Sequence, residues 1–230
     1  MNVDFIESWG SDLSVVNAAR VSFDKHSNEL VPKDEKLIHY LAKHKHTSCF
    51  EHMGATLKLK VPIFIARQIQ RHRTFSYNEV SRRYVDSPPE FFWPDKWRKR
   101  AENTKQGSSD EEITGYVFHE WSGDDTIKYQ YGVDTTAQQA AEQVVDHAIE
   151  TYEAMLYAGV APELARMILP QNLYTEMYMS GNLRAWSHFL HLRLDGHAQK
   201  EVQDVAQMVA DILTPLFSVS MEALLTYDTK

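Results

Sequence analysis

The glycines of this chain are too widely spaced to build a glycine-rich phosphate-binding loop. Of the nine glycines, the closest neighbours, such as Gly115 and Gly123, stand eight positions apart. Loops of the G-x-G-x-x-G and G-x-x-x-x-G-K types need glycines closer together, because the backbone itself must approach a phosphate. The sequence therefore excludes both loops. Side chains must hold the phosphates of any dinucleotide that binds.

The charge balance and the cysteine content exclude further classes of protein. The 230 residues include 24 basic and 32 acidic side chains, whereas a general nucleic-acid binder needs a broad positive surface. Cys49 is the single cysteine, so the chain can form neither an internal disulfide nor a thiolate zinc site. We expect a globular protein in a reducing compartment, with no nucleic-acid partner.

The N-terminal sequence MNVDFIESWG lacks the basic region and apolar run of a signal peptide. No segment approaches the roughly 18 consecutive apolar residues of a membrane-spanning helix. We therefore expect no membrane association and a location in the cytoplasm, or in the host cytoplasm if a virus encodes the protein.

Hydrophobic periodicity predicts many helices and a small sheet. Helical spacing of apolar residues predicts helices over 32–44, 63–71, 135–157, from Pro162, from a cap at Asn182, and over 198–216. Alternation predicts a strand over 55–61 that Pro62 ends, and the ambiguous pattern over 173–180 is compatible with another. The predicted fold class is α+β, a helix-rich single domain with a small, mainly antiparallel sheet.

Residues 86–134 differ in amino-acid composition from the rest of the chain. The proline pair at 88–89, Pro94 and the glycine-containing stretches at 107–110 and 123–125 interrupt them. Four aromatic residues could anchor them: Phe91, Phe92, Trp93 and Trp97. We favour a surface excursion over a separate module. The predicted organisation is one domain over 1–230 with this excursion at about 86–134.

The segment from 67 to 83 concentrates positive charge in an acidic chain. It contains five arginines, opposed only by Glu79: Arg67, Arg71, Arg73, Arg82 and Arg83. A guanidinium group suits bidentate contact with a phosphate. A solvated surface is the alternative, but an exposed helix would normally mix acidic residues with the basic ones. We therefore favour an anionic ligand at this segment.

The spacing of residues in and near this segment indicates what kind of anionic ligand could bind. If residues 78–84 are extended, Glu79, Ser81 and Arg83 project on one face and offer an acceptor, a hydroxyl and a guanidinium in a row. Such a row suits the sugar and the phosphate of one nucleotide. Gln68 and Arg71 lie three positions apart, so on a helix they would share a face and could meet the same ligand.

The same segment resembles the flavin-dependent thymidylate synthase family. The family signature R-H-R, seven residues, S stands here as Arg71-His72-Arg73 followed by Ser81, and the longer form RHR-x-x-SYNE-x-S-x-RY also fits. Further matches are HTSCFEH at 46–52, VPIFIARQ at 61–68, GVAPELARMILP at 159–170 and NLRAWSHFLHLRLDGHAQ at 182–199. Together the matches cover most of residues 10–220 outside the excursion.

The resemblance implies reductive methylation of dUMP to dTMP without a cysteine nucleophile. In this family 5,10-methylenetetrahydrofolate is the carbon donor, FAD the redox carrier and NADPH the reductant. The resemblance also implies a homotetramer whose active sites lie between subunits, with the flavin held by more than one chain.

The resemblance assigns site residues by position. The positions matched to FAD contacts are His46, Ser48, Arg71, His72, Arg73, Glu79, Asn182, Arg184 and His188. The positions matched to dUMP contacts are Gln68, Arg71, Glu79, Ser81, Arg82, Arg83, Arg166 and Arg193. Arg193 is the implied catalytic residue, because a positive group beside the pyrimidine favours negative charge on the ring.

Nucleophilic catalysis and metal binding fit the sequence less well. Cys49 and Ser81 could be nucleophiles, but neither has an adjacent base in sequence, and we expect a structural thiol and a phosphate ligand. The histidines lack the spacing of a ligand face, so no metal is expected. Two alternatives stay open: a non-catalytic nucleotide- or RNA-binding module, and a flavoprotein that methylates another pyrimidine.

Overall fold

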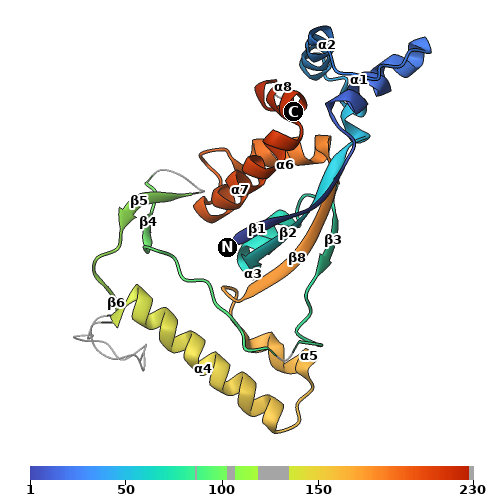
Figure 1. Cartoon of the computed structure of the whole chain (residues 1–230). Helices are drawn as coiled ribbons and strands as arrows, with labels where there is room; N and C mark the ends of the chain where they lie inside the picture. The colour runs from blue at the N-terminus through green and yellow to red at the C-terminus, as the bar shows by residue number, and fades with distance from the viewer. Residues whose placement is uncertain (86, 103–106, 119–134, 228–230) are drawn as a thin grey trace. The chain divides into compact units, whose positions relative to one another are not determined.

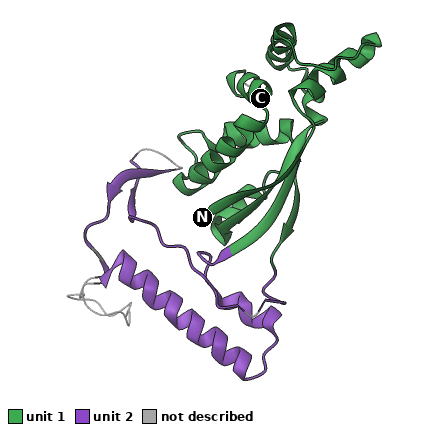
Figure 2. Ribbon diagram, viewed as in Figure 1, with its two compact units in different colours: residues 1–80, 175–230 green, residues 81–174 purple. Residues whose placement is uncertain are grey.

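The computed structural model describes residues 1–85, 87–102, 107–118 and 135–227. The chain divides into two compact units, shown in green and purple in Figure 2. The first unit comprises Met1–Val80 and Thr175–Lys230, and the second comprises Ser81–Tyr174.

The first unit is built on a four-stranded sheet with the strand order β1-β2-β8-β3 (Figure 1). Its strands are β1 (Asn2–Trp9), β2 (Gly54–Pro62), β3 (Ser76–Glu79) and β8 (Tyr174–Asn182). β1 is antiparallel to β2, and β3 is antiparallel to β8 with Tyr77 opposite Met179. The predicted α+β class with a small antiparallel sheet is confirmed.

Helices supply the rest of this unit. They are α1 (Asp12–Arg20), α2 (Pro32–Lys43), α3 (Ile63–Ile69), α6 (Leu183–Arg193), α7 (Lys200–Leu216) and α8 (Ser218–Thr226), with short 3-10 turns η1 (Val21–Phe23) and η2 (Thr47–Glu51). Proline begins α2 at the predicted position, and the Oδ1 of Asn182 caps α6 by accepting from the N–H of Ala185 at 2.9 Å. Both predicted helix starts are confirmed.

The core of this unit lies between the sheet and its helices. Trp186 and Phe189 of α6 are fully buried together with strand residues such as Leu57 and Met179. The indole N–H of Trp186 donates to the carbonyl of Ala55 at 3.1 Å, so the one polar atom of this large side chain is paired. This packing fixes α6, which carries several predicted site residues.

The second unit contains a long helix and short strand pairs. Its elements are α4 (Ala137–Tyr157), α5 (Pro162–Ala165), the 3-10 turn η3 (Arg166–Ile168), and the strands β4 (Arg98–Arg100), β5 (Ser108–Glu112), β6 (Tyr116–Phe118) and β7 (Thr135–Thr136). The side chain of Thr136 accepts from the backbone N–H of Gln139 and caps α4. The helices predicted over 135–157 and from Pro162 are therefore present.

Part of the predicted excursion is described by the structure. Phe91 forms a bridge with Leu173, and the indole of Trp97 donates to Gln138 at 2.9 Å, so two of the predicted aromatic anchors do contact the unit. Residues 86, 103–106 and 119–134 lie outside the described residues. The organisation as one domain with an excursion stays a prediction.

Among the described residues, no helix combines the length and apolarity needed to cross a membrane.

Candidate functional site

The Arg71-His72-Arg73 segment occupies a tight reversal between α3 and β3. The helix ends at Ile69, two residues earlier than predicted, and the N–H of His72 donates to the Ile69 carbonyl at 3.0 Å. The hydroxyl of Tyr77 lies 3.0 Å from the Ile69 carbonyl and 2.9 Å from that of His72. Burial raises the pKa of Tyr77 to about 12, so this hydroxyl remains a donor at neutral pH. The reversal leaves Arg71 and Arg73 exposed and turns His72 inward.

His72 meets the last residue of α6. The Nε of Arg193 donates to the Nε2 of His72 at 2.9 Å, and the Nη2 of Arg193 donates to the carbonyl of Gln68 at 3.0 Å. Burial, and then the charges of Arg193 and His188, lower the pKa of His72 to about 4. Burial also lowers the pKa of the Arg193 guanidinium. At neutral pH the pair is therefore an uncharged imidazole that accepts a hydrogen bond from a cation.

Glu79 and Gln68 have partners within the protein. The Glu79 carboxylate accepts from the side chains of Gln70 at 2.9 Å and Thr175 at 2.8 Å. The side-chain amide of Gln68 donates to Gln199 at 2.6 Å. The predicted shared helix face of Gln68 and Arg71 is wrong, because α3 ends before Arg71.

The extended row predicted over 78–84 is also wrong. Pairing with the sheet stops after the N–H of Val80 donates to the Glu176 carbonyl at 2.9 Å. The N–H of Tyr84 then donates to the carbonyl of Ser81 at 3.0 Å, which closes a turn. Glu79 belongs to β3, whereas Ser81 and Arg83 begin the second unit, so these three side chains do not line one face of a strand.

The second unit instead brings Ser81 together with two arginines. The Oγ of Ser81 accepts from the Nε of Arg83 at 3.2 Å and from Nη1 of Arg166 at 3.3 Å. A hydroxyl between two guanidinium groups is a suitable phosphate site, because all three groups can donate to phosphate oxygens. Arg82 does not join this cluster. Its guanidinium donates to the carbonyls of Ser87 and Pro88.

A cavity of about 640 Å³ opens in the first unit, and three predicted FAD residues line it: His46, Ser48 and Arg184. The aliphatic residues Leu37 and Leu41 contribute to its walls. The sequence did not point to Arg20, Phe23 or Tyr40, which line the same cavity. Phe23 is 73% exposed, an unusual position for a large apolar side chain and a signal visible only in the structure.

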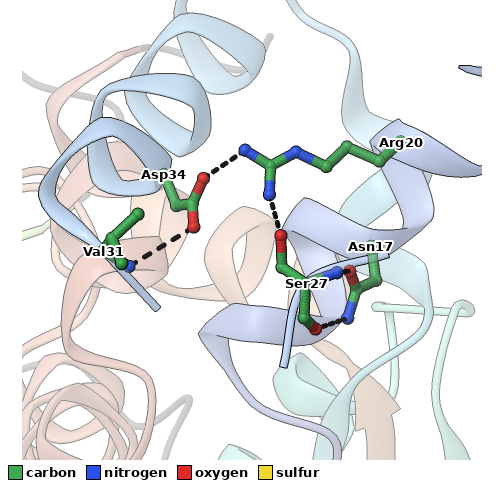
Figure 3. A network of polar contacts seen from close by, with 5 residues as sticks. All are labelled: Asn17, Arg20, Ser27, Val31 and Asp34. Carbon is green, nitrogen blue, oxygen red and sulfur yellow. Dashed lines mark hydrogen bonds and ion pairs between the residues drawn. The ribbon is translucent and has the colours of Figure 1, made fainter. Parts of the chain in front are cut away.

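A polar network holds the loop of residues 21–31, which contributes Ser22 and Phe23 to the lining of the cavity. Figure 3 shows the guanidinium of Arg20 between the Asp34 carboxylate and the Ser27 hydroxyl. The side chain of Asn17 accepts from the N–H of Ser27 at 2.8 Å and donates to its carbonyl at 3.0 Å (Figure 3). Asp34 is fully buried and also accepts from the N–H of Val31. The network therefore ties this loop to both α1 and α2.

Three predicted flavin residues lie on α6 or at its N-cap: Asn182, Arg184 and His188. Nη1 of Arg184 lies 2.5 Å from the carboxylate of Glu51, and both side chains are substantially exposed. Asn182 uses Oδ1 as the helix cap, and within the described part of the chain its amide N–H₂ has no hydrogen-bond partner and could donate to a ligand. The exposed His188 lies on the same helix, and its ring centroid is 6.0 Å from that of His72.

Cys49 lines the cavity but shows no activation. Burial raises the pKa of its thiol, which lowers the thiolate fraction at neutral pH. Among the described residues, no group of three or more His, Cys, Asp or Glu side chains could hold a metal ion.

Comparison with known proteins decides the family. Residues 4–217 match the family model described as thymidylate synthase complementing protein. The chain is 38% identical over 225 residues to the flavin-dependent thymidylate synthase of Kosmotoga olearia, covering 98% of this chain and 90% of that protein. It is 39% identical over 211 residues to that of Thermus thermophilus, covering 92% and 70%. The chain belongs to the flavin-dependent thymidylate synthase family.

A solved structure in the comparison is similar over nearly the whole chain. The UMP/dUMP methylase PolB from Streptomyces cacaoi, in its crystal structure with 5-Br dUMP, has a TM-score of 0.78 and 32% identity. The match covers 99% of this chain and 96% of that one. The same methylase with 5-Br UMP gives a TM-score of 0.76. The chain therefore shares its fold with this methylase.

Proposed function

We propose that this chain converts dUMP to dTMP, with 5,10-methylenetetrahydrofolate as carbon donor, FAD as cofactor and NADPH as reductant. Family membership over residues 4–217 is the observation that carries the proposal. In the reaction, carbon 5 of the pyrimidine loses its proton and gains a methyl group. The donor leaves as tetrahydrofolate, and NADPH is oxidised to NADP⁺.

The phosphate of dUMP is assigned to Ser81, Arg83 and Arg166. The contacts of 3.2 and 3.3 Å between the Ser81 hydroxyl and the two guanidinium groups support this assignment. Two cations in a chain of net charge −8 provide the local positive potential that a phosphate requires. The role proposed for Arg82 is weaker, because its guanidinium already contacts two backbone carbonyls.

The pyrimidine is assigned to Arg193, which we propose as the catalytic residue. Its guanidinium is half-buried, and within the described residues Nη1 has no hydrogen-bond partner. Negative charge that develops on a bound ring is stabilised by a nearby cation. This stabilisation is stronger in a poorly solvated site than it is when the cation is surrounded by water. We also propose dUMP contacts for Gln68, Arg71 and Glu79, as the family resemblance implies.

The cavity residues fit part of an FAD molecule. Aliphatic walls suit a ring system, while Arg184 and His46 offer donors for phosphate oxygens. FAD, when bound, supplies the redox chemistry that connects NADPH to the transferred carbon. His46, Ser48 and Arg184 would hold it at this cavity. The other positions that the family resemblance matches to FAD are Arg71, His72, Arg73, Glu79, Asn182 and His188.

The distribution of these residues supports a shared site in a homotetramer. Of the nine residues that the family resemblance matches to FAD, the described lining of the cavity includes only the three named above. A flavin held by more than one subunit accounts for a divided set. We propose that the active sites lie between subunits, that the enzyme is cytoplasmic, and that it has no nucleic-acid or membrane partner.

Release of tritium from [5-³H]dUMP tests the proposal, with FAD, NADPH and methylenetetrahydrofolate present. Tritium release that requires all three compounds is the expected result. A colourless protein that cannot be reconstituted with flavin and retains RNA after purification would instead indicate a non-catalytic RNA-binding module.

A second substrate is supported by one specific observation. PolB, similar over 99% of this chain, is a UMP/dUMP methylase and was crystallised with both brominated nucleotides. Parallel assays with [5-³H]UMP and [5-³H]dUMP distinguish the two activities. We expect a higher kcat/KM for dUMP, and a preference for UMP would assign the chain to the methylation of another pyrimidine.

A further inference from the structure

The imidazole of His72 has an environment unlike that of a surface cofactor ligand. The residue is 6% exposed, and its ring lies edge-on to fully buried Phe189 with centroids 5.0 Å apart. Its backbone carbonyl lies 2.9 Å from the Tyr77 hydroxyl, and its N–H donates to Ile69. Ring and backbone are thus both held by the protein.

The ring uses Nε2 to accept a hydrogen bond. The donor is the Nε of Arg193, which always carries a proton, so Nε2 must be unprotonated and the ring proton must lie on Nδ1. The charged or titratable groups that act on the ring are Arg193 and His188, both from α6. Both disfavour a second proton on the ring.

The contacts of Arg193 leave one side of its guanidinium for a ligand. Nε and Nη2 form one edge of the planar group, and these two atoms donate to His72 and to the Gln68 carbonyl at 2.9 and 3.0 Å. Two hydrogen bonds on one edge fix the plane of the group. Nη1, on the other side, has no hydrogen-bond partner among the described residues.

We infer that His72 is a positioning residue for Arg193: its neutral imidazole orients the guanidinium toward the pyrimidine, and the ring itself does not contact the flavin. The inference rests on the proposed function of Arg193. It changes the role of His72, which the family resemblance alone places among the FAD contacts.

Two substitutions separate a positioning role from flavin binding. His72→Leu removes the acceptor, whereas His72→Gln places an amide oxygen near the position of Nε2. We expect His72→Leu to lower kcat for tritium release by about 100-fold, because a misoriented catalytic group loses its alignment with the substrate. FAD content and the rate of flavin reduction by NADPH should stay within about twofold of the wild type, and His72→Gln should recover most of kcat.

Two results with His72→Leu would overturn the inference. If His72→Leu loses FAD and His72→Gln does not restore it, then His72 is a flavin ligand. Turnover of His72→Leu within about twofold of the wild type would also overturn it, since no positioning would then be needed.

A double-mutant cycle of His72→Asn and Arg193→Lys gives a second readout should His72→Leu fold poorly. His72→Asn shortens the side chain and withdraws the acceptor, whereas Arg193→Lys keeps the positive charge but lacks the Nε donor. We expect His72→Asn to lower kcat in the wild type and to change it little in the Arg193→Lys background. Losses that multiply in the double variant would show that His72 acts independently of Arg193, which contradicts the inference.

Failure of the proposed function is distinguishable from failure of this inference. If the wild type releases no tritium from either nucleotide, the proposed function fails, and ¹⁵N NMR of the histidine rings still tests the contact. The Nε2 signal of His72 should be that of an unprotonated acceptor at pH 6 and should shift in Arg193→Ala. An Nε2–H signal, or no shift, would overturn the assigned contact.

Discussion

Nη1 of Arg166 donates to the Oγ of Ser81 at 3.3 Å, although 85 positions separate the two residues. Arg83 contacts the same oxygen from within the turn that Ser81 begins. The serine of the family signature therefore lies between two cations and has no adjacent histidine or carboxylate contact among the described residues. This geometry is that of an anion site and differs from that of an activated nucleophile.

Replacement of Arg166 should weaken nucleotide binding selectively. We expect Arg166→Ala to raise the KM for dUMP by about 10- to 100-fold, because a charge-assisted contact to phosphate is lost. Reduction of the flavin by NADPH without dUMP should stay near the wild-type rate. Lys99→Ala, which removes an exposed cation of the same unit, is the matched control and should leave KM unchanged. Equal effects of the two variants would contradict the proposed phosphate site.

Arg82 provides a comparison between resemblance and geometry. Its guanidinium contacts the carbonyls of Ser87 and Pro88 and not Ser81. We therefore expect Arg82→Ala to raise the KM for dUMP less than Arg166→Ala does. Steady-state kinetics on both variants check this order. The reverse order would mean that Arg82 leaves these carbonyls to bind the nucleotide.

The buried carboxylate of Asp34 should contribute strongly to stability. Asp34→Asn leaves the guanidinium of Arg20 without its charged partner, and we expect a loss of about 3 kcal/mol in the free energy of unfolding. Asp204→Asn, which breaks the exposed pair with Lys200, should cost no more than about 0.5 kcal/mol. Urea denaturation of both variants measures the difference. Similar losses would show that the Arg20 network does not stabilise the fold.

The pH dependence of stability should contain a contribution from His72. Its pKa falls from a usual value of 6.5 to about 4 in the folded protein, so the unfolded chain binds more protons between these values. The neutral His72 ring contributes its full share to the free energy of unfolding above pH 6.5. As the pH falls toward 4, the free energy of unfolding decreases by up to about 3 kcal/mol from this residue. Unfolding free energies measured from pH 7 to pH 4 should decrease less steeply for His72→Gln than for the wild type. Parallel curves would contradict the lowered pKa.

Cys49 should be dispensable for the reaction. Burial raises the pKa of its thiol, and we expect folded, flavin-loaded Cys49→Ala to release tritium from dUMP within about twofold of the wild-type rate. Arg193→Ala is the inactive comparison. Loss of turnover in Cys49→Ala, with its flavin content intact, would restore the cysteine as a nucleophile.

Local chemistry made parts of the fold predictable. Pro32 starts α2 and Asn182 caps α6, because proline and a capping amide act within one turn of the helix. The strand ending at Pro62 was predictable for the same reason. By contrast, β1, α1 and α8 were not predicted, since the exposed face of an edge strand and short helices give weak periodic signals.

The site shows where sequence patterns stop being informative. Alternating residues after Glu79 suggested a strand, but β3 ends there and a hydrogen bond from Tyr84 to Ser81 closes a turn. The contact between Arg193 and His72 joins residues 121 positions apart, and no local pattern specifies it. The cavity wall formed by Arg20 and Phe23 likewise depends on tertiary packing.

Formation of dTMP by the purified protein tests the proposed reaction itself. Purified, FAD-reconstituted protein is incubated with dUMP, methylenetetrahydrofolate and NADPH, and the nucleotide product is identified by mass spectrometry. We expect dTMP in the complete mixture and none when FAD, NADPH or the folate is omitted. Unmethylated dUMP from a folded protein that has bound both flavin and nucleotide would contradict it.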